Sequence, residues 1–221
     1  MSDHVQVQID TRDMVALHGA FARALSDAPG QLSSVGTGNT DRARRLADYL
    51  GELFWLFHAH HEGEDELLYP LLVQRVSTHH ETFSRMDAQH VAVSSSIDAA
   101  ERAVEQFGSS GGLVDAQTAI AACEALLVTM AEHVTDEEET VLPLAARVIS
   151  PPEWGAMPAH ALSRYPGERV WLPFGLAFEG MPGDIQENML ARLPSPVSAM
   201  WLGGGSDAFA NEMAIIRGGS I

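Results

Sequence analysis

Histidine and glutamate residues occur in a pattern that the chain contains twice. The pattern is a lone histidine, a second histidine 42 or 43 residues later, a glutamate four residues further on, and a proline six residues after the glutamate. It comprises His18, His60, Glu64 and Pro70 in the first half, and His90, His133, Glu137 and Pro143 in the second. Residues four apart lie on one face of a helix, so a histidine and a glutamate at this spacing can reach one metal ion. Four imidazoles and two carboxylates in one helix bundle suit two metal ions that share bridging carboxylates.

The two glutamates strengthen the prediction of a metal site. A buried carboxylate costs several kcal/mol unless it is paired with a cation or bound to a metal. Neither Glu64 nor Glu137 has a lysine or arginine within one helical turn. A single histidine on an apolar helix face is usually an ordinary core residue, but four histidines in register with two such glutamates favour metal binding.

Apolar residues at helical spacing predict four amphipathic helices within residues 1–150. The first begins at a cap on Asp10 or Thr11 and ends at the Pro29–Gly30 break. A Gly- and Ser-rich loop over 30–40 leads to a second helix capped by Thr40 or Asp41. The stripe of this second helix contains the predicted ligands among apolar residues: Leu46, Leu50, Leu53, Phe57, His60, Glu64, Leu67 and Leu71.

The third predicted helix runs from about residue 81 to Phe107, and the fourth runs from the GSSGG turn at 108–112 to Pro151. His90 and His133 again stand among inward apolar residues. Because proline removes a backbone hydrogen bond, Pro70 and Pro143 should bend or break the second and fourth helices. The fold class expected for residues 1–150 is therefore all-α, an antiparallel four-helix bundle.

Residues 151–221 differ in composition from the rest and are expected to form an extension packed on the bundle. They hold 8 of the 11 prolines, 10 of the 19 glycines and three of the four tryptophans. This composition predicts mostly irregular structure, with short helices over 183–193 and 206–217. The predicted domains are therefore 1–150 and 151–221.

The composition also limits the partners and the location. The net charge of −17 disfavours nucleic acid and anionic membrane surfaces as partners. The single cysteine, Cys123, allows neither an intrachain disulfide nor a thiolate metal cage. Residues 1–13 lack the features of a signal peptide, and no apolar run approaches the ~20 residues of a membrane span. A cytoplasmic location is expected, and a homo-oligomer is left open.

Two segments together with two lone histidines resemble the hemerythrin-like, or HHE cation-binding, family. The segments are HHEGEDELLYPLL at 60–72 and EHVTDEEETVLPLA at 132–145, and the resemblance extends over about residues 10–150. It implies a four-helix bundle holding two non-haem irons bridged by carboxylates and an oxo or hydroxo group, with no catalytic residue beyond the metal ligands. The terminal ligands that it implies are His18, His60, His90 and His133, and the implied bridges are Glu64 and Glu137. Manganese and zinc remain alternatives, because histidine and carboxylate suit several divalent ions.

The sequence departs from the pattern of the oxygen-carrying members of that family at two places. Those members have two histidines one turn apart on the third helix, whereas Met86 and Ser94 stand at that spacing from His90. An open coordination position is therefore expected, unless His61 fills it. The last bridging carboxylate of the carriers lies five residues after its histidine, which would be Glu138, but the internal repeat favours Glu137.

Three functions are compatible with these residues. The first is a di-iron protein that reacts with dioxygen or hydrogen peroxide in a redox, catalase-like or protective role, which leaves open whether the protein is an enzyme. The second is a sensor of oxygen, nitric oxide or iron, and the third is an iron store without turnover. The expected partners are dioxygen, peroxide or another small diatomic ligand.

Overall fold

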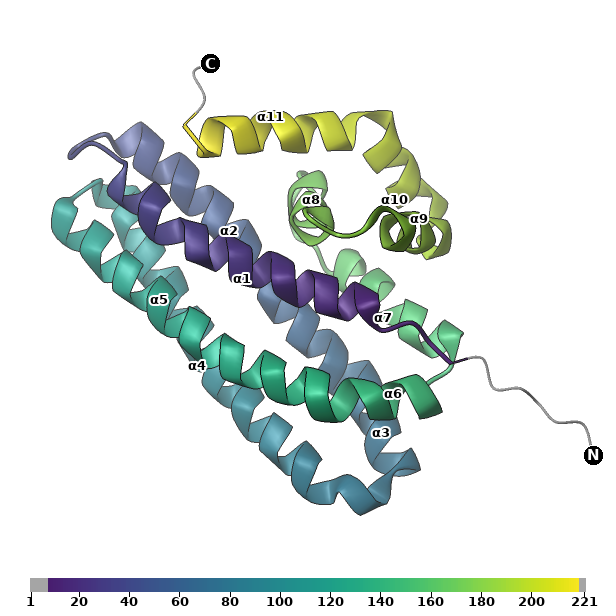
Figure 1. The fold of residues 1–221 in the computed structure, drawn as a ribbon. Coiled ribbons are helices and arrows are strands. Elements are labelled where there is room, and N and C mark those ends of the chain that lie inside the picture. Colours follow the sequence, from purple (N-terminus) through teal and green to yellow (C-terminus); the bar gives the residue numbers. More distant parts are fainter. Residues whose placement is uncertain (1–7, 219–221) are drawn as a thin grey trace, which may run out of the picture.

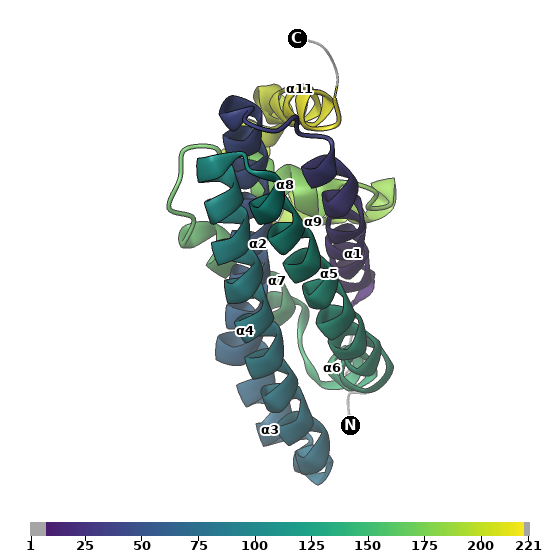
Figure 2. The ribbon, with the colours of Figure 1, turned by 90° about the vertical axis from the view of Figure 1, so that its left-hand side faces the viewer.

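Four long helices form the main body of the protein. The computed structural model describes residues 8–218, which contain helices and turns but no strand. The long helices are α1 (Arg12–Ser33), α2 (Thr40–Gly63), α4 (His80–Ser110) and α5 (Leu113–Asp136). Consecutive long helices run in opposite directions, with α2 against α4, α4 against α5 and α5 against α1 (Figures 1 and 2). The predicted antiparallel four-helix bundle is confirmed. The first seven of the N-terminal residues used to predict the location lie outside the described range.

The first connection is shorter than the sequence predicted. Helix α1 continues through Pro29 and Gly30 to Ser33, so the expected break at this pair was wrong. The additional turn buries Leu32 completely, and this burial offsets the hydrogen bond that a proline removes. The cap of α2 is Asn39, one residue before the predicted position, and its side chain accepts a hydrogen bond from the Arg42 N–H at 3.1 Å.

A wide π-helical turn interrupts both ligand-bearing helices. In the second helix it spans Glu64–Leu68 and leads into α3 (Tyr69–Arg75), and in the fourth it spans Glu137–Val141 and leads into α6 (Leu142–Val148). Pro70 and Pro143 stand in the first turns of α3 and α6. A proline ring clashes with the carbonyl four residues before it, and a turn with one extra residue relieves that clash. The predicted interruptions thus take the form of two π turns, each beginning at a predicted bridging glutamate.

The extension is mostly helical, so the expectation of mostly irregular structure was wrong. Its helices are α7 (Pro151–Ser163), α8 (Trp171–Phe178), α9 (Gly183–Arg192), α10 (Ser195–Met200) and α11 (Ser206–Ile216). The two predicted short helices correspond to α9 and α11. Several prolines that suggested breaks stand in first helical turns, where the missing N–H costs nothing. Helix α7 begins in this way with Pro151 and Pro152, after a capping box in which Ser150 and Glu153 bind each other's backbone N–H groups.

The extension packs along one side of the bundle. Helix α7 contacts α2, α8 contacts α1 and α2, and α11 lies across α8 near the start of α2 (Figure 1). Leu172, Leu176 and Phe209 from the extension belong to the same buried apolar cluster as the upper part of the bundle. Residues before and after Pro151 thus share one hydrophobic core. The division into two domains, 1–150 and 151–221, stays a prediction.

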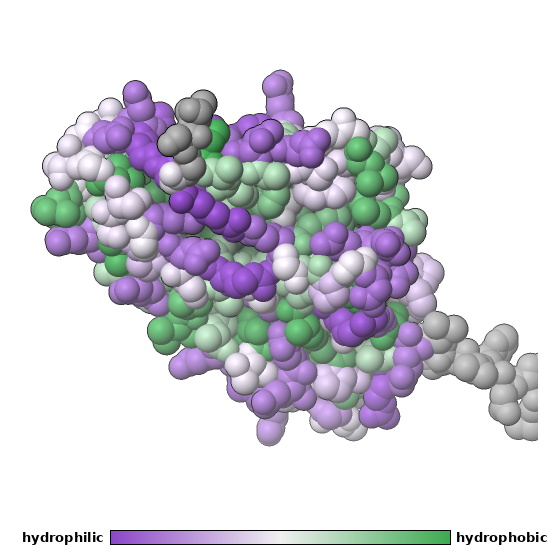
Figure 3. All heavy atoms as spheres, turned by 45° about the horizontal axis from the view of Figure 1, so that its top comes forward, coloured by the Kyte–Doolittle hydropathy of each residue, from purple (hydrophilic) through white to green (hydrophobic). Residues whose placement is uncertain are grey.

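The fourth helix of the bundle is unusually apolar. By length and composition alone, the continuous stretch Leu113–Val148 could cross a membrane, a property that core helices of soluble proteins share. The inner face of this stretch buries Cys123, Leu126 and Met130 against the other helices. Figure 3 shows one face of the molecule, on which hydrophilic and hydrophobic residues are intermixed. The expectation that the protein has no membrane partner stays a prediction.

Candidate metal centre

The predicted ligands form a polar layer between two hydrophobic clusters. One cluster includes Phe21, Phe57, Val93 and Met130, and the other includes Met14, Leu68, Met86 and Val141. On each long helix a predicted histidine stands between a residue of the first cluster and a residue of the second. The helices therefore enclose the site in apolar packing on both sides along the bundle axis.

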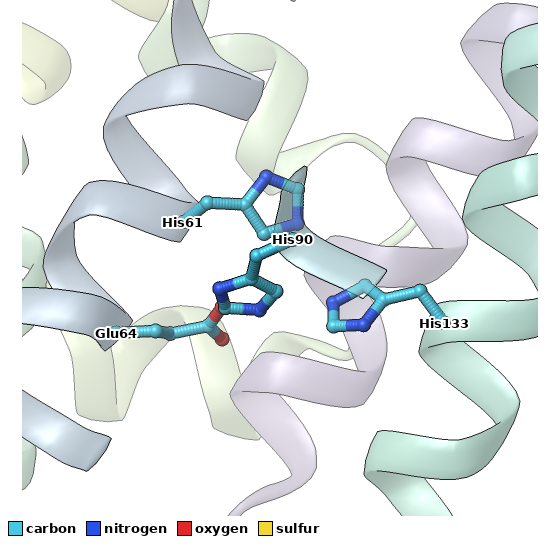
Figure 4. A group of neighbouring side chains, drawn as sticks. All are labelled: His61, Glu64, His90 and His133. Atoms are coloured by element: carbon cyan, nitrogen blue, oxygen red, sulfur yellow. The ribbon is translucent and has the colours of Figure 1, made fainter. Parts of the chain in front are cut away.

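Seven side chains from the four helices meet in this layer as two groups that share Glu64. One group is His61, Glu64, His90 and His133, and the other is His18, His60, Glu64 and Glu137. Within each group the candidate ligand atoms lie within 4.8 Å of one another. Atoms that bind one ion at ~2.1 Å lie within about 4.2 Å of each other, so small adjustments suffice. Figure 4 shows His61, Glu64, His90 and His133 turned toward one common space.

Both glutamates lie between the two groups. The two oxygens of Glu64 face different histidines, with Oε1 3.4 Å from His60 Nε2 and Oε2 3.6 Å from His90 Nε2. Glu137 Oε2 lies 3.4 Å from His18 Nε2 and 3.8 Å from His133 Nε2. Each carboxylate thus reaches a histidine of both groups, which is the position that a bridging ligand requires.

Several polar atoms of this layer are buried without a hydrogen-bond partner among the described residues. They are both carboxylate oxygens of Glu64, Oε2 of Glu137, Nε2 of His90 and His133, and Nδ1 of His61. Unsatisfied buried polar atoms are rare in folded proteins because each costs about 1–3 kcal/mol. Metal cations would satisfy all of them and would compensate the two buried carboxylates, so the residues present fit a metal centre.

The residue after each predicted bridge orients a histidine of the opposite half. Asp65 Oδ1 lies 2.7 Å from His90 Nδ1, and Glu138 Oε1 lies 2.9 Å from His18 Nδ1. Histidines that bind metals commonly donate their second ring N–H to a carboxylate, which fixes the ring and directs the other nitrogen to the metal. The repeat therefore includes the acidic residue after each glutamate. The acid of each half contacts the lone histidine of the other half.

Glu138 is thus placed beside His18 rather than among the inward carboxylates. Its side chain is 30 % exposed, whereas that of Glu137 is fully buried. This geometry favours Glu137 as the bridge, in agreement with the internal repeat. The assignment of each residue as a metal ligand stays a prediction.

Two further side chains at the site had no signal in the repeat. Gln89 Oε1 lies 3.4 Å from His133 Nδ1, and the Tyr69 hydroxyl donates to Glu137 Oε1 at 3.4 Å. Tyr69 directly precedes Pro70, but the corresponding residue of the second half is Leu142, so comparison of the halves could not identify it. The acidic residues Asp65 and Glu138 could have been found, because both halves carry an acid at that position.

His61 takes part in the group that contains His90. It is 8 % exposed, and its ring centroid lies 4.7 Å from that of His90 and 5.2 Å from that of His133. In the second half of the repeat the corresponding residue is Val134. One group therefore contains three imidazoles and the other contains two.

Burial makes the charged forms of these groups unfavourable in the metal-free protein. Burial, reinforced by the nearby Glu137 carboxylate, raises the pKa of Glu64 well above its usual range. Burial, reinforced by neighbouring histidines, lowers the pKa of His60 and His61 well below the usual range and that of His133 to about 3. The imidazoles of His60, His61 and His133 are therefore neutral at pH 7, the form that binds metals.

These pKa shifts predict a stability maximum near pH 6.5 for the metal-free protein. From pH 5 to about 6.5, the unfolded state binds more protons at His60, His61 and His133, so the free energy of unfolding rises with pH. Above that range the histidines no longer contribute. The raised pKa of Glu64 makes the folded state bind more protons until Glu64 ionises in the folded protein, so stability falls with rising pH once the histidines have titrated in the unfolded state. Urea unfolding from pH 5 to 9 measures this profile, and stability that still rises above pH 7 would contradict it.

Comparison with known families agrees with the residues of the site. The model of the hemerythrin HHE cation binding domain matches residues 10–145, which is more than half of the chain and includes all seven side chains of the two groups. No curated protein and no solved structure matches the chain.

Proposed function

Because the chain belongs to the hemerythrin HHE cation binding domain family, we propose that it holds two iron ions and reacts with hydrogen peroxide or dioxygen in a protective redox role. The observation that carries this proposal is the pair of groups sharing Glu64, with a histidine and a carboxylate in each. Iron bound by few histidines and a carboxylate keeps coordination positions for small molecules. When bound there, iron would supply Lewis acidity and electron transfer.

A groove with several polar side chains supports access of a small substrate to the group with three histidines. The groove lies between α2 and α4, and its lining includes His61, Asp65, Tyr69 and His90 together with the exposed Glu62 and Asp87. Hydrogen peroxide is small, uncharged and able to form hydrogen bonds, so it fits a groove of this kind. His61 lines the groove and belongs to the group that contains Glu64, so its ring is placed where it would limit the approach to the site.

The proposal predicts catalytic turnover of peroxide by the iron-loaded protein. We expect oxygen release or rapid substrate oxidation over many turnovers when the iron protein is mixed with peroxide in a stopped-flow instrument. Fully reversible oxygen uptake with no peroxide turnover would contradict the proposal and favour a carrier or sensor. Iron retention with neither reaction would favour a store.

His61→Ala tests whether this ring limits access. We expect peroxide turnover per bound iron to be unchanged or faster, because the substitution opens the groove toward the site. The matched control is His58→Ala, which changes a groove residue outside the two groups. A slower rate per bound iron in His61→Ala alone would show that this imidazole assists the reaction instead.

The location and the larger partners are further parts of the proposal. The net charge of −17 supports a protein that acts on small molecules rather than on nucleic acid or anionic membranes. We propose a cytoplasmic protein. Fractionation of the native cells and size-exclusion chromatography of the purified protein would test the location and the oligomeric state.

A further inference from the structure

An apolar cavity lies on the opposite side of α2 from the groove beside His61. Its walls come from α1 and α2 of the bundle and from α7, α8 and α9 of the extension, and it shares no lining residue with the groove. Leu17, Trp55 and Ala59 contribute from the bundle, and Trp154, Ala161 and Phe174 contribute from the extension. The extension lies beyond residue 145, where the family match ends, so about half of the residues that line this cavity lie outside the matched domain.

The cavity offers very little hydrogen bonding to a ligand. Asp13 and His60 are the only ionisable residues in its lining. The carboxylate of Asp13 is already engaged, because Trp154 Nε1 lies 3.1 Å from both oxygens and the Arg192 guanidinium donates at 3.2 Å. His60 directs Nε2 to His18 at 3.2 Å, inside the predicted metal layer. A charged ligand would lose its hydration in this cavity without gaining a partner.

The size of the cavity limits the ligand as well. Its volume is about 110 Å³. An apolar protein cavity of about 150 Å³ stays dry and takes up benzene or xenon. A cavity that is somewhat smaller and equally apolar can hold a small gas molecule or, with slight adjustment of its walls, one aromatic ring.

We propose that this cavity binds a small, uncharged, apolar molecule, no larger than about one aromatic ring, and holds it against His60. The extension would thereby give the centre a second approach, almost entirely apolar, whereas several ionisable side chains line the groove. The functional importance of a contact with His60 rests on the proposed metal function. Binding in the cavity does not depend on that function, so it can be tested with the metal-free protein.

Benzene and benzoate, which have the same ring, provide the probes. A ligand that binds only the folded state raises the unfolding temperature. We expect benzene to raise the unfolding temperature of the metal-free protein by a few degrees at saturation and benzoate to have no effect. Ala161→Phe, which fills the cavity from α7, should abolish the rise. Ala156→Phe makes the same change at an exposed position of α7 outside the cavity and should leave the rise intact.

A second measurement locates the ligand and does not depend on a cavity-filling variant. Benzene should shift the ring-proton NMR signals of His60 in the metal-free protein and leave those of His133, which is outside the lining, unchanged. The proposal is overturned if benzene fails to stabilise the wild-type protein, if benzoate stabilises it equally, or if the His60 signals do not move. Equal benzene effects in a folded Ala161→Phe and in Ala156→Phe would also overturn it. Loss of peroxide activity with intact benzene binding would count against the proposed function alone.

Discussion

Glu64→Gln should reduce the iron content from about two ions per chain to less than one. Glu64 is the only residue that belongs to both groups of candidate ligands, with one oxygen near His60 and the other near His90. Glutamine keeps the size of the side chain but removes the negative charge and one of the two acceptor oxygens. Both metal positions lose a ligand at once. Elemental analysis after anaerobic iron loading measures the result.

Glu62→Gln is the matched control for this substitution. Glu62 lies on the same helix, is exposed, and contacts Arg164 at 3.2 Å on the surface. We expect this variant to keep two irons. A Glu64→Gln protein that retains two irons would contradict the bridging role. The metal-free Glu64→Gln protein should also be at least as stable as wild type at pH 8, because a neutral amide replaces a buried carboxylate that burial disfavours. That result would separate metal loss from misfolding.

Glu137→Gln should lower the number of irons bound at saturation, whereas Glu138→Gln should lower only the affinity for iron. Glu137 lies near histidines of both groups, so its loss should leave less than one iron per chain. Glu138 contacts only the outer nitrogen of His18, and loss of such an orienting partner typically weakens metal affinity by about 10–100-fold. Glu138→Gln should therefore still load fully at saturating iron.

Iron titration of both variants distinguishes these two roles. A competing chelator measures affinity, and elemental analysis at saturation measures stoichiometry. If Glu138→Gln loses iron at saturation while Glu137→Gln keeps it, the bridge is Glu138 and the internal repeat is misleading. Asp65→Asn provides a parallel test, because Asp65 supports His90 in the other half in the same way.

The internal repeat predicted the positions that converge in space, and physical reasons explain what it could not predict. His18, His60, His90 and His133 lie on inward stripes, so helical periodicity was enough to bring them together. His61 is different, because it follows an inward residue directly and is rotated about 100° from it on an α-helix. Only the packing of α4 and α5 shows that a ring at this position is buried beside His90.

Packing also decided the features that sequence reasoning got wrong. Pro29 and Gly30 favour a helix end locally, but Leu32 gains complete burial when the helix continues. The many prolines of the extension led to a wrong prediction of irregular structure, because a proline in a first turn favours the helix that follows it. The apolar cavity could not be predicted at all, because its walls come from five helices spread along the chain from Asp13 to Met189.

The pairing of His61 with Val134 across the repeat makes the two groups of candidate ligands unequal. A duplication that preserved every position would create two equivalent metal positions, related by the same approximate symmetry as the two halves. Here one group has three imidazoles and the other has two, while Glu64 belongs to both. Metal ions held by the two groups would therefore have different ligand sets, with His61, His90 and His133 on one side and His18 and His60 on the other. A centre built from a repeated half would thus have two unequal positions because of the identity of one residue.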